Sequence, residues 1–158
     1  EDHRIQFSEW PAIKPTIPYQ QLPVVEIDGV TFNQSLAIGR YLAKKAGLIG
    51  KTDLDEIRVD AILDTIDDFF TKFPWTDQDS DKKNQKEYVA KSGSPLLSYL
   101  DESLGDKSWF VGDSVTWADF FWDTCTDTLY HYVPDFGKDY PKLMALKDRV
   151  KSIPAIAA

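Results

Sequence analysis

The pattern of the chain changes near residue 50, and this change constrains the fold more than any other feature. Residues 1–34 contain alternating and β-branched runs that are typical of strands. Residues 35–46 have helical spacing, and every segment after Gly50 also carries apolar residues at helical spacing. The boundaries predicted from this change are a partial α/β domain over residues 1–47, a linker over 48–54 and an all-helical domain over 55–158.

Three short strands are predicted in the first domain, over residues 3–7, 23–28 and 30–33. Asp28-Gly29 favours a two-residue hairpin turn between the last two, because both positions of such a turn need positive φ. Three strands with one hairpin cannot bury both faces of a sheet. We therefore expect the helical domain, or residues outside this sequence, to cover the sheet.

Apolar stripes predict two long helices next, over about residues 55–73 and 83–104. Gly93 and Pro95 are expected to kink or split the second. The charged segment 77–83 between them is predicted as a loop or a helix start.

Cap signals then predict two further helices. Thr116 and Asp119 have the spacing of a capping box, which opens a helix that carries the only cysteine, Cys125. Pro141 suits the first position of a last helix that ends at about Ser152. We interpret Cys125 as a small buried hydrophobe rather than a nucleophile, because it lies on an apolar stripe.

Charge and cysteine content exclude several classes of partner. Lys and Arg number 18 and Asp and Glu 26, so the net charge is −8. Such a surface repels nucleic acid and anionic membranes, and no apolar run is long enough to span a bilayer. A single cysteine allows no internal disulfide, which fits a reducing, cytoplasmic location.

Two junctions in the first domain offer backbone groups to a ligand. Pro23 is either an ordinary strand-starting proline or follows a cis bond that turns the backbone of Leu22 outward. Gln34-Ser35 stands where a strand meets a helix. The helix N-terminus there either holds a carboxylate or is simply capped by Ser35.

The first long helix carries an acidic face. Its aspartates follow one another at i, i+4, i+7 and i+8, so like charges repel. The face either attracts a hard divalent cation, a basic partner or a ligand amine, or it is solvated. Trp75, just past the helix, either walls a pocket or belongs to the core. The four aspartates are Asp60, Asp64, Asp67 and Asp68.

Taken together, several segments resemble the cytosolic glutathione transferases. These segments are residues 22–29, 33–38, 40–42, Ser114 and 117–119. Residues 1–5, 59–62, 64–69, 73–75 and 114–120 are similar to the sigma class, and within it to prostaglandin-isomerising members. The resemblance implies an incomplete α/β thioredoxin-like N-terminal domain followed by an all-α helical domain.

The resemblance also implies the glutathione-binding positions. Trp10 and Lys14 would reach the glycine carboxylate, and Asp68 of a second copy would meet the γ-glutamyl amine. Gln21 departs from the prostaglandin-isomerising members, which carry a basic residue there, so one charge contact is lost. The implied positions are Trp10, Lys14, Gln21, Leu22, Pro23, Gln34, Ser35 and Asp68.

A second substrate, a lipid or an electrophilic small molecule, would lie in a pocket of the helical domain. Phe121 departs from the prostaglandin-isomerising members, which have an aromatic hydroxyl at that position. Three aspartates match positions that hold Mg²⁺ or Ca²⁺ at the interface of a homodimer. The implied pocket residues are Phe70, Trp75, Cys125 and Thr128, and the implied metal ligands are Asp64, Asp67 and Asp68.

The activity that the resemblance implies is conversion of prostaglandin H2 to prostaglandin D2, together with glutathione conjugation of electrophiles. In the isomerisation the thiolate would attack an endoperoxide oxygen, and glutathione would be regenerated. The alternative is a non-catalytic relative, a crystallin-like or truncated protein that binds glutathione or has a structural role. The retained glutathione-binding positions favour the enzyme.

The N-terminus departs most from the family. The chain opens on Glu1 rather than Met, and we expect it to be an internal segment of a longer protein. The family has a preceding strand and helix that carry a tyrosine, which lowers the pKa of the glutathione thiol, and an arginine near the sulfur. We therefore assign no catalytic residue within residues 1–158 and expect these residues alone to be catalytically weak and poorly stable.

Overall fold

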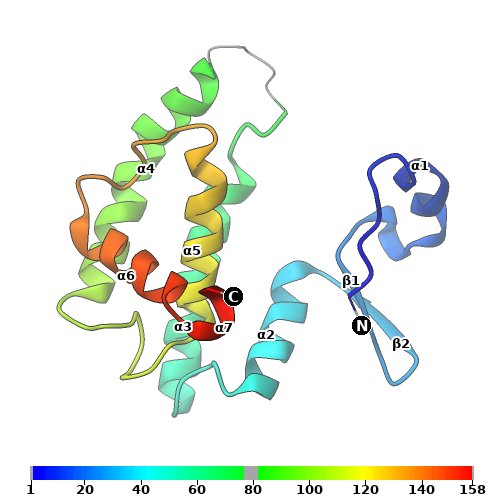
Figure 1. The fold of residues 1–158 in the computed structure, drawn as a ribbon, viewed down its shortest axis with the longest axis horizontal. Helices are drawn as coiled ribbons and strands as arrows, with labels where there is room; N and C mark the ends of the chain where they lie inside the picture. Colours follow the sequence, from blue (N-terminus) through cyan, green and yellow to red (C-terminus); the bar gives the residue numbers. More distant parts are fainter. Residues whose placement is uncertain (1, 77–81, 158) are drawn as a thin grey trace. The chain divides into compact units, whose positions relative to one another are not determined.

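The computed structural model describes residues 2–76 and 82–157. The chain divides into two compact units, Glu1–Gly47 (unit 1) and Leu48–Ala158 (unit 2). Unit 1 contains the only sheet in the described residues, whereas unit 2 is helical (Figure 1).

The sheet of unit 1 has two antiparallel strands, β1 (Val24–Ile27) and β2 (Val30–Asn33). Asp28 and Gly29 join them with φ angles of 52° and 77°. Both angles are positive, as a two-residue hairpin turn requires. The hairpin predicted from Asp28-Gly29 is therefore confirmed.

Helix α2 (Ser35–Ala46) follows the sheet and has the predicted bounds. Gly47 ends it in the left-handed conformation, with φ 71°, and its N–H bonds back to the carbonyls of Ala43 and Lys44. Before the sheet, the chain forms three short helical stretches: α1 (Trp10–Ile13), η1 (Lys14–Thr16) and η2 (Pro18–Gln20).

The strand predicted over residues 3–7 is wrong. Residues 3–6 have no regular secondary structure, and a turn begins at Phe7, with the N–H of Glu9 bonded to the carbonyl of Gln6 at 2.9 Å. A strand needs a neighbour for its backbone groups. The only ladder in the described residues joins β1 and β2, so the alternation of Ile5 and Phe7 has no partner strand.

Unit 2 is built from antiparallel and crossing helices packed on one core. Helix α5 packs against both α3 and α6, and α4 also contacts α3 and α6 (Figure 1). No helix of the described residues combines the length and the apolar character needed to cross a membrane. The helices are α3 (Asp53–Thr71), α4 (Lys83–Leu104), α5 (Trp117–Tyr130), α6 (Pro141–Lys151) and α7 (Pro154–Ala157).

Helix α3 begins two residues earlier than predicted because of a capping box. The N–H of Asp55 bonds to Thr52 Oγ1 at 3.1 Å, and the N–H of Thr52 bonds to Asp55 Oδ2 at 3.2 Å. Helix α4 has the predicted bounds, and it runs through Pro95 without being split. Of the predicted charged segment 77–83, residues 77–81 lie outside the described residues.

The capping box predicted at the start of α5 is confirmed. Asp119 is fully buried and accepts hydrogen bonds from the N–H of Thr116 at 2.7 Å and the N–H of Phe110 at 2.9 Å. Its carboxylate thus ties the preceding loop to the helix. Burial raises the pKa of Asp119 above its ordinary value, although these hydrogen bonds act to lower it.

Candidate functional site

The junction before β1 lines a large hollow of unit 1. The peptide bond between Leu22 and Pro23 is cis. Of the two alternatives for Pro23, an ordinary strand-starting proline and a proline after a cis bond, the structure has the cis bond. The side chain of Leu22 is half exposed, at 47%. Both residues line a hollow of about 860 Å³ whose other walls are residues 2–5, Ile17 and 24–26.

At the junction between β2 and α2, Ser35 is not the residue that caps the helix. Ser35 is the first helical residue, and the N-cap is Gln34, which has φ 77° and makes no side-chain capping bond. The first backbone bond of the helix runs from the N–H of Ile38 to the carbonyl of Gln34 at 3.0 Å. The N–H groups of residues 35–37 therefore precede the helical ladder, which suits a carboxylate.

The other predicted glutathione residues of unit 1 lie on the short helical stretches and the loop after them. Trp10 opens α1 and is half buried. Lys14, one turn further on, is exposed, and so is Gln21, which is in extended backbone before Leu22. The structure thus leaves a cation and two amide side chains, Gln21 and Gln34, exposed within unit 1.

In unit 2 the structure brings Trp75 and Phe70 together. The indole Nε1 of Trp75 donates to the carbonyl of Phe70 at 2.8 Å, and the two ring centroids are 5.5 Å apart. The Trp75 ring also lies 4.4 Å from Phe73. Since Trp75 is still 38% exposed, it is fixed at the edge of the core with one part of its ring open to solvent.

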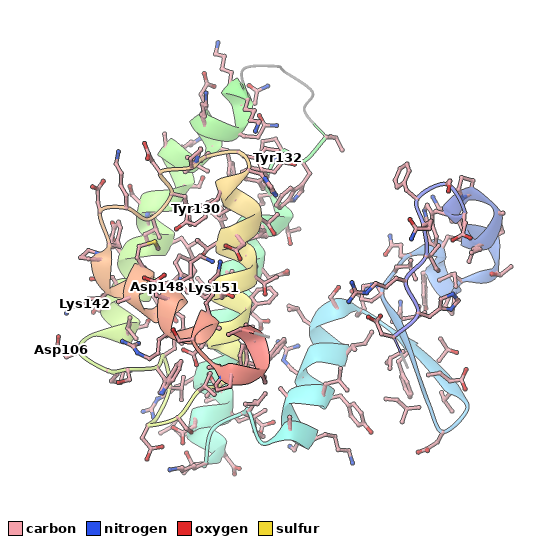
Figure 2. The ribbon with its side chains drawn as sticks, in the orientation of Figure 1. Asp106, Tyr130, Tyr132, Lys142, Asp148 and Lys151 are labelled. Atoms are coloured by element: carbon pink, nitrogen blue, oxygen red, sulfur yellow. The ribbon has the colours of Figure 1, made fainter. Side chains whose placement is uncertain are left out.

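Tyr132 also belongs to this aromatic cluster, although no pattern in the sequence predicted it. Its ring meets Phe73 edge-on at 5.2 Å and Trp75 at 5.8 Å, just past the end of α5 (Figure 2). Lys82 Nζ lies 5.3 Å above the Tyr132 ring and also donates to the carbonyl of His131. No local signal marks Tyr132, because its neighbours Phe73, Trp75 and Lys82 lie between α3 and α4, far from it in the sequence.

Cys125 and Thr128 both lie on α5. Cys125 is buried, as predicted, and burial together with the negative charge of Asp67 raises the pKa of its thiol to about 12. The thiol is therefore protonated at neutral pH and a poor nucleophile. Thr128 is exposed, and its hydroxyl donates to the carbonyl of Thr124 at 3.0 Å.

The acidic face of α3 does not form a metal site within one copy. Asp64 and Asp68 are exposed and Asp67 is half buried. Lys72 Nζ lies 3.9 Å from Asp68 Oδ1, and Thr71 Oγ1 lies 3.4 Å from Asp67 Oδ2. Within residues 2–76 and 82–157, no three His, Cys, Asp or Glu side chains are grouped so that they hold a metal ion.

Comparisons with known proteins identify the family. The domain family described as "Glutathione S-transferase, C-terminal domain" matches residues 63–158. The chicken (Gallus gallus) protein named hematopoietic prostaglandin D synthase is 52% identical over 160 residues, which cover 100% of this chain and 80% of that protein. The chain belongs to the glutathione S-transferase family. Proteins of this family use glutathione.

Solved structures agree with this membership. The structure titled "rat hPGDS complexed with a quinoline" superposes on this glutathione S-transferase with a TM-score of 0.91 and 48% identity, covering 99% of this chain and 80% of that chain. A third relative, S-crystallin SL11 of Nototodarus sloanii, is 32% identical over 100% of this chain and 81% of its own length. The expected fold, a thioredoxin-like α/β unit before an all-helical domain, is thereby confirmed.

Proposed function

We propose that this glutathione S-transferase is an enzyme that isomerises prostaglandin H2 to prostaglandin D2 and conjugates glutathione to electrophiles. The observation that carries the proposal is the 52% identity to the chicken hematopoietic prostaglandin D synthase, spread over the whole chain. Bound glutathione would supply the thiol for both reactions. The protein's own residues bind it and shape the pocket for the second substrate.

Unit 1 fits glutathione in the chemistry of its donors. The tripeptide carries two carboxylates, an amine and peptide groups. The uncapped N-terminus of α2, with Gln34 and Ser35, suits the γ-glutamyl carboxylate. The exposed Lys14 and the indole of Trp10 suit the glycine carboxylate.

The cysteinyl unit would pair with the backbone of Leu22, which lines the 860 Å³ hollow beside Pro23. Gln21 borders this position and supplies an uncharged amide. Asp68 from a second copy would meet the γ-glutamyl amine, which requires a homodimer. Within one copy, Asp68 lies exposed on α3 and remains accessible to a partner.

The second substrate would be an apolar molecule that carries the reacting group. The half-exposed ring of Trp75, held by its hydrogen bond to Phe70, offers a fixed apolar wall. Cys125 and Thr128 would line the pocket from α5, with Cys125 as a buried, uncharged contact. A weakly polar wall of this kind suits a lipid better than a charged substrate.

Glutathione binding and product analysis test the proposal. Titration calorimetry should detect glutathione binding, and chromatography should find prostaglandin D2 after prostaglandin H2 is added with glutathione. Lys14→Met should weaken glutathione binding about tenfold, because a charge-assisted hydrogen bond is lost. Lys45→Met is the matched control, since Lys45 also belongs to unit 1 but contacts the ring of Tyr41. Equal affinity in both variants would contradict the assigned site.

A second function, a structural role without catalysis, is favoured by one observation. S-crystallin SL11 is 32% identical over the whole chain. The two functions separate in a simple assay, in which glutathione is mixed with a generic aryl halide and the conjugate is followed by absorbance. A protein that binds glutathione but forms no conjugate and no prostaglandin D2 would support the structural role.

We further propose that a divalent cation, Mg²⁺ or Ca²⁺, is held at the interface of a homodimer by Asp64, Asp67 and Asp68 of two copies. The support is chemical, since carboxylates are the ligands these ions prefer and one copy alone groups too few of them. Sedimentation should show a dimer, and Mg²⁺ should change turnover. If the variant with all three aspartates changed to Asn keeps the same Mg²⁺ response, the face is only solvated.

The cysteine content supports a proposal about the cellular location. Cys125 is the only cysteine of the sequence, and it is buried as a free thiol. Such a chain has no need of an oxidising compartment. We propose a cytoplasmic location, which immunostaining of source cells would test.

A further inference from the structure

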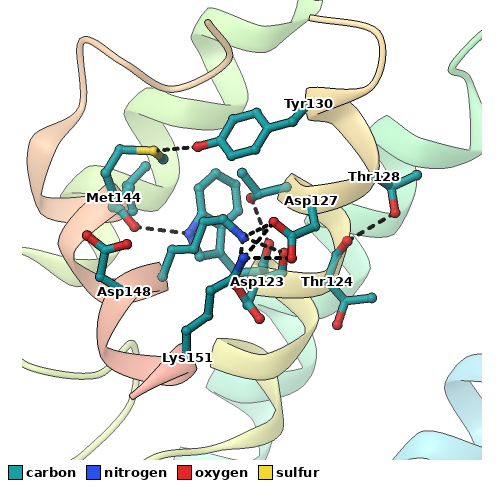
Figure 3. A network of polar contacts seen from close by, with 12 residues as sticks. Asp123, Thr124, Asp127, Thr128, Tyr130, Met144, Asp148 and Lys151 are labelled. Carbon is teal, nitrogen blue, oxygen red and sulfur yellow. Dashed lines mark hydrogen bonds and ion pairs between the residues drawn. The ribbon is translucent and has the colours of Figure 1, made fainter. Parts of the chain in front are cut away.

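An ion-pair network joins α5 to α6, with Lys147 and Asp123 buried and Asp127 and Lys151 at the surface. The side chain of Lys147 is only 6% exposed, and its Nζ lies 2.7 Å from Asp123 Oδ1 and 2.5 Å from Asp127 Oδ1. Lys151, one turn further along α6, lies 2.9 Å from Asp127 Oδ2. Figure 3 shows Asp127 of α5 beside Lys151 of α6, with Asp123 on the same stretch of α5. The network contains two positive and two negative charges and is therefore balanced.

The burial of Lys147 makes its partners essential. An ammonium group removed from water is destabilising unless carboxylates and carbonyls replace the lost hydration. Lys147 has both, because its Nζ also lies 3.2 Å from the backbone carbonyl of Asp123. It therefore bonds to the helix backbone of α5 as well as to side chains.

The same stretch of α5 has three successive carbonyls that each accept a second donor. The carbonyl of Trp122 accepts from Thr126 Oγ1 at 2.7 Å, and that of Thr124 accepts from Thr128 Oγ1 at 3.0 Å. Between them, the carbonyl of Asp123 accepts from Lys147. Hydroxyl bonds to the i−4 carbonyl bend helices. The local shape of α5 thus depends on side chains, and among these three donors only Lys147 comes from another helix.

The opposite face of α5 carries the proposed pocket residues. Asp123 and Asp127 are four residues apart and face α6. Cys125 lies between them in sequence and on the other side of the helix, where the charge of Asp67 on α3 acts on its thiol. Thr128 is three residues beyond Cys125, so the two side chains lie on the same side of the helix.

We propose that Lys147 is a positioning residue for the second-substrate pocket. By holding the turn at residues 123–127 against α6, it sets where Cys125 and Thr128 lie on the far face of α5. This inference rests on the proposed function, because the assignment of those two residues to the pocket belongs to it. Lys147 touches no substrate and acts through the helix.

Two other contacts make the effect of Lys147 local. Trp122 Nε1 donates to the carbonyl of Leu143 at 3.2 Å, and the hydroxyl of Tyr130 donates to Met144 Sδ at 3.0 Å. They hold α5 to α6 on either side of the network. Loss of Lys147 should therefore release the middle of α5 and leave the helix attached.

The reactivity of Cys125 tests the inference without any substrate. An aromatic disulfide reagent should label Cys125, the only cysteine of the sequence, slowly in the wild type. In Lys147→Met the labelling rate should rise about tenfold, because local opening becomes easier. Lys147→Arg should restore most of the protection. An unchanged rate in Lys147→Met, measured below the melting temperature, would overturn the inference.

Lys142→Met is the matched control in the same helix. Lys142 pairs with Asp106 at 2.8 Å, but the two side chains are 52% and 97% exposed (Figure 2). This variant should label like the wild type. If Lys147→Met fails to fold, the double variant Lys147→Met, Asp123→Asn leaves no unpaired charge at position 123 and should show the same faster labelling.

Kinetics test the link to the pocket. In Lys147→Met the KM for an aryl halide should rise about fivefold while the KM for glutathione stays unchanged, since only differential binding of the second substrate is affected. A purely structural role would lower the melting temperature and leave both KM values unchanged, which would overturn the inference. A wild type that conjugates no electrophile would instead refute the proposed function, and the labelling rates would still decide whether Lys147 positions α5.

Discussion

The two units of the molecule bury very different amounts of apolar surface. Among the described residues, unit 2 buries twenty hydrophobic side chains in one cluster, whereas unit 1 buries only Ala43. Phe7 and Tyr19 in unit 1 are 92% and 81% exposed. All buried polar and charged side chains of the described residues, such as Asp119 and Lys147, also belong to unit 2.

This difference separates the two proposed binding roles. Apart from Asp68 of a second copy, the residues proposed for glutathione lie at turns and helix ends of unit 1, where little packing holds them. The residues proposed for the second substrate, such as Trp75 and Cys125, lie on or against the core of unit 2. Segments with few buried contacts open at low free energy. We therefore expect ligand binding to order unit 1 and to leave unit 2 nearly unchanged.

The largest expected effect is the loss of a core leucine in unit 2. Leu63 is fully buried, so Leu63→Ala should lower the free energy of unfolding by about 3 kcal/mol through lost transfer energy and a cavity. Leu42→Ala in unit 1 is the matched control, since Leu42 is 51% exposed. Urea denaturation followed by circular dichroism measures both. Similar losses in the two variants would contradict the view that unit 2 depends on a buried core and unit 1 does not.

Glutathione should stabilise unit 1 next most strongly. At a hundred times its Kd, a ligand that binds only the folded state adds about 2.7 kcal/mol. Hydrogen exchange should therefore slow in β1, β2 and the first turns of α2, with little change in the slowest amides of α3 and α5. Uniform slowing over the whole chain would show that the units do not respond separately.

A smaller loss is expected from the capping box of α5. Asp119→Ala leaves the N–H groups of Thr116 and Phe110 without their buried acceptor, which should cost about 2 kcal/mol. Asp55→Ala removes the matching carboxylate of the capping box at α3. There the N–H of Thr52 can form a hydrogen bond with water instead. Thermal denaturation should show a smaller shift for Asp55→Ala. The reverse order would mean that burial does not decide the strength of the cap.

The features predicted correctly from the sequence have their partners close in the chain. Asp28-Gly29, Gly47 and the pair Thr116 and Asp119 each act within three or four residues, so spacing alone reveals them. The capping box at Thr52 has the same spacing as the one at Thr116 and was equally predictable.

The features that were missed depend on distant partners. Tyr132 meets Trp75 across 57 residues, and Lys147 meets Asp123 across 24, so the sequence gives no sign of either pair. The strand predicted over residues 3–7 fails for the same reason, because a ladder depends on a neighbour and not on alternation alone. In unit 1, where few contacts form, local turn signals were the most reliable.

Each unit has a glycine with positive φ at which alanine should cost a similar amount of stability. Gly29 and Gly112 have φ angles of 77° and 69°, and an added Cβ would meet no atom within 4 Å at either position. Alanine at each should therefore cost about 1 kcal/mol from the left-handed conformation alone. In Gly112→Ala the loss should appear in global unfolding by urea. In Gly29→Ala it should appear as faster hydrogen exchange of β1 and β2, and an equal global loss in both would contradict separate unfolding.

The smallest expected effect concerns pH and the ion-pair network of unit 2. Burial by itself would raise the pKa of Asp127, but the hydrogen bonds from Lys147 and Lys151 outweigh it and hold the pKa below its ordinary value. A carboxyl group with a lowered folded pKa contributes stability that is present above its unfolded pKa, about 3.9, and is lost as the pH falls through the folded pKa.

Asp127→Asn should therefore lose less stability than the wild type between pH 5 and pH 3, in urea titrations at each pH. Asp119 should affect the pH dependence of stability in the opposite direction. Because its pKa is raised in the folded state, the free energy of unfolding should fall as the pH rises above the ordinary pKa of an aspartate. Asp119→Asn should remove that fall. If both variants followed the wild-type pH dependence, the carboxyl groups of Asp127 and Asp119 would not control how the stability of unit 2 varies with pH.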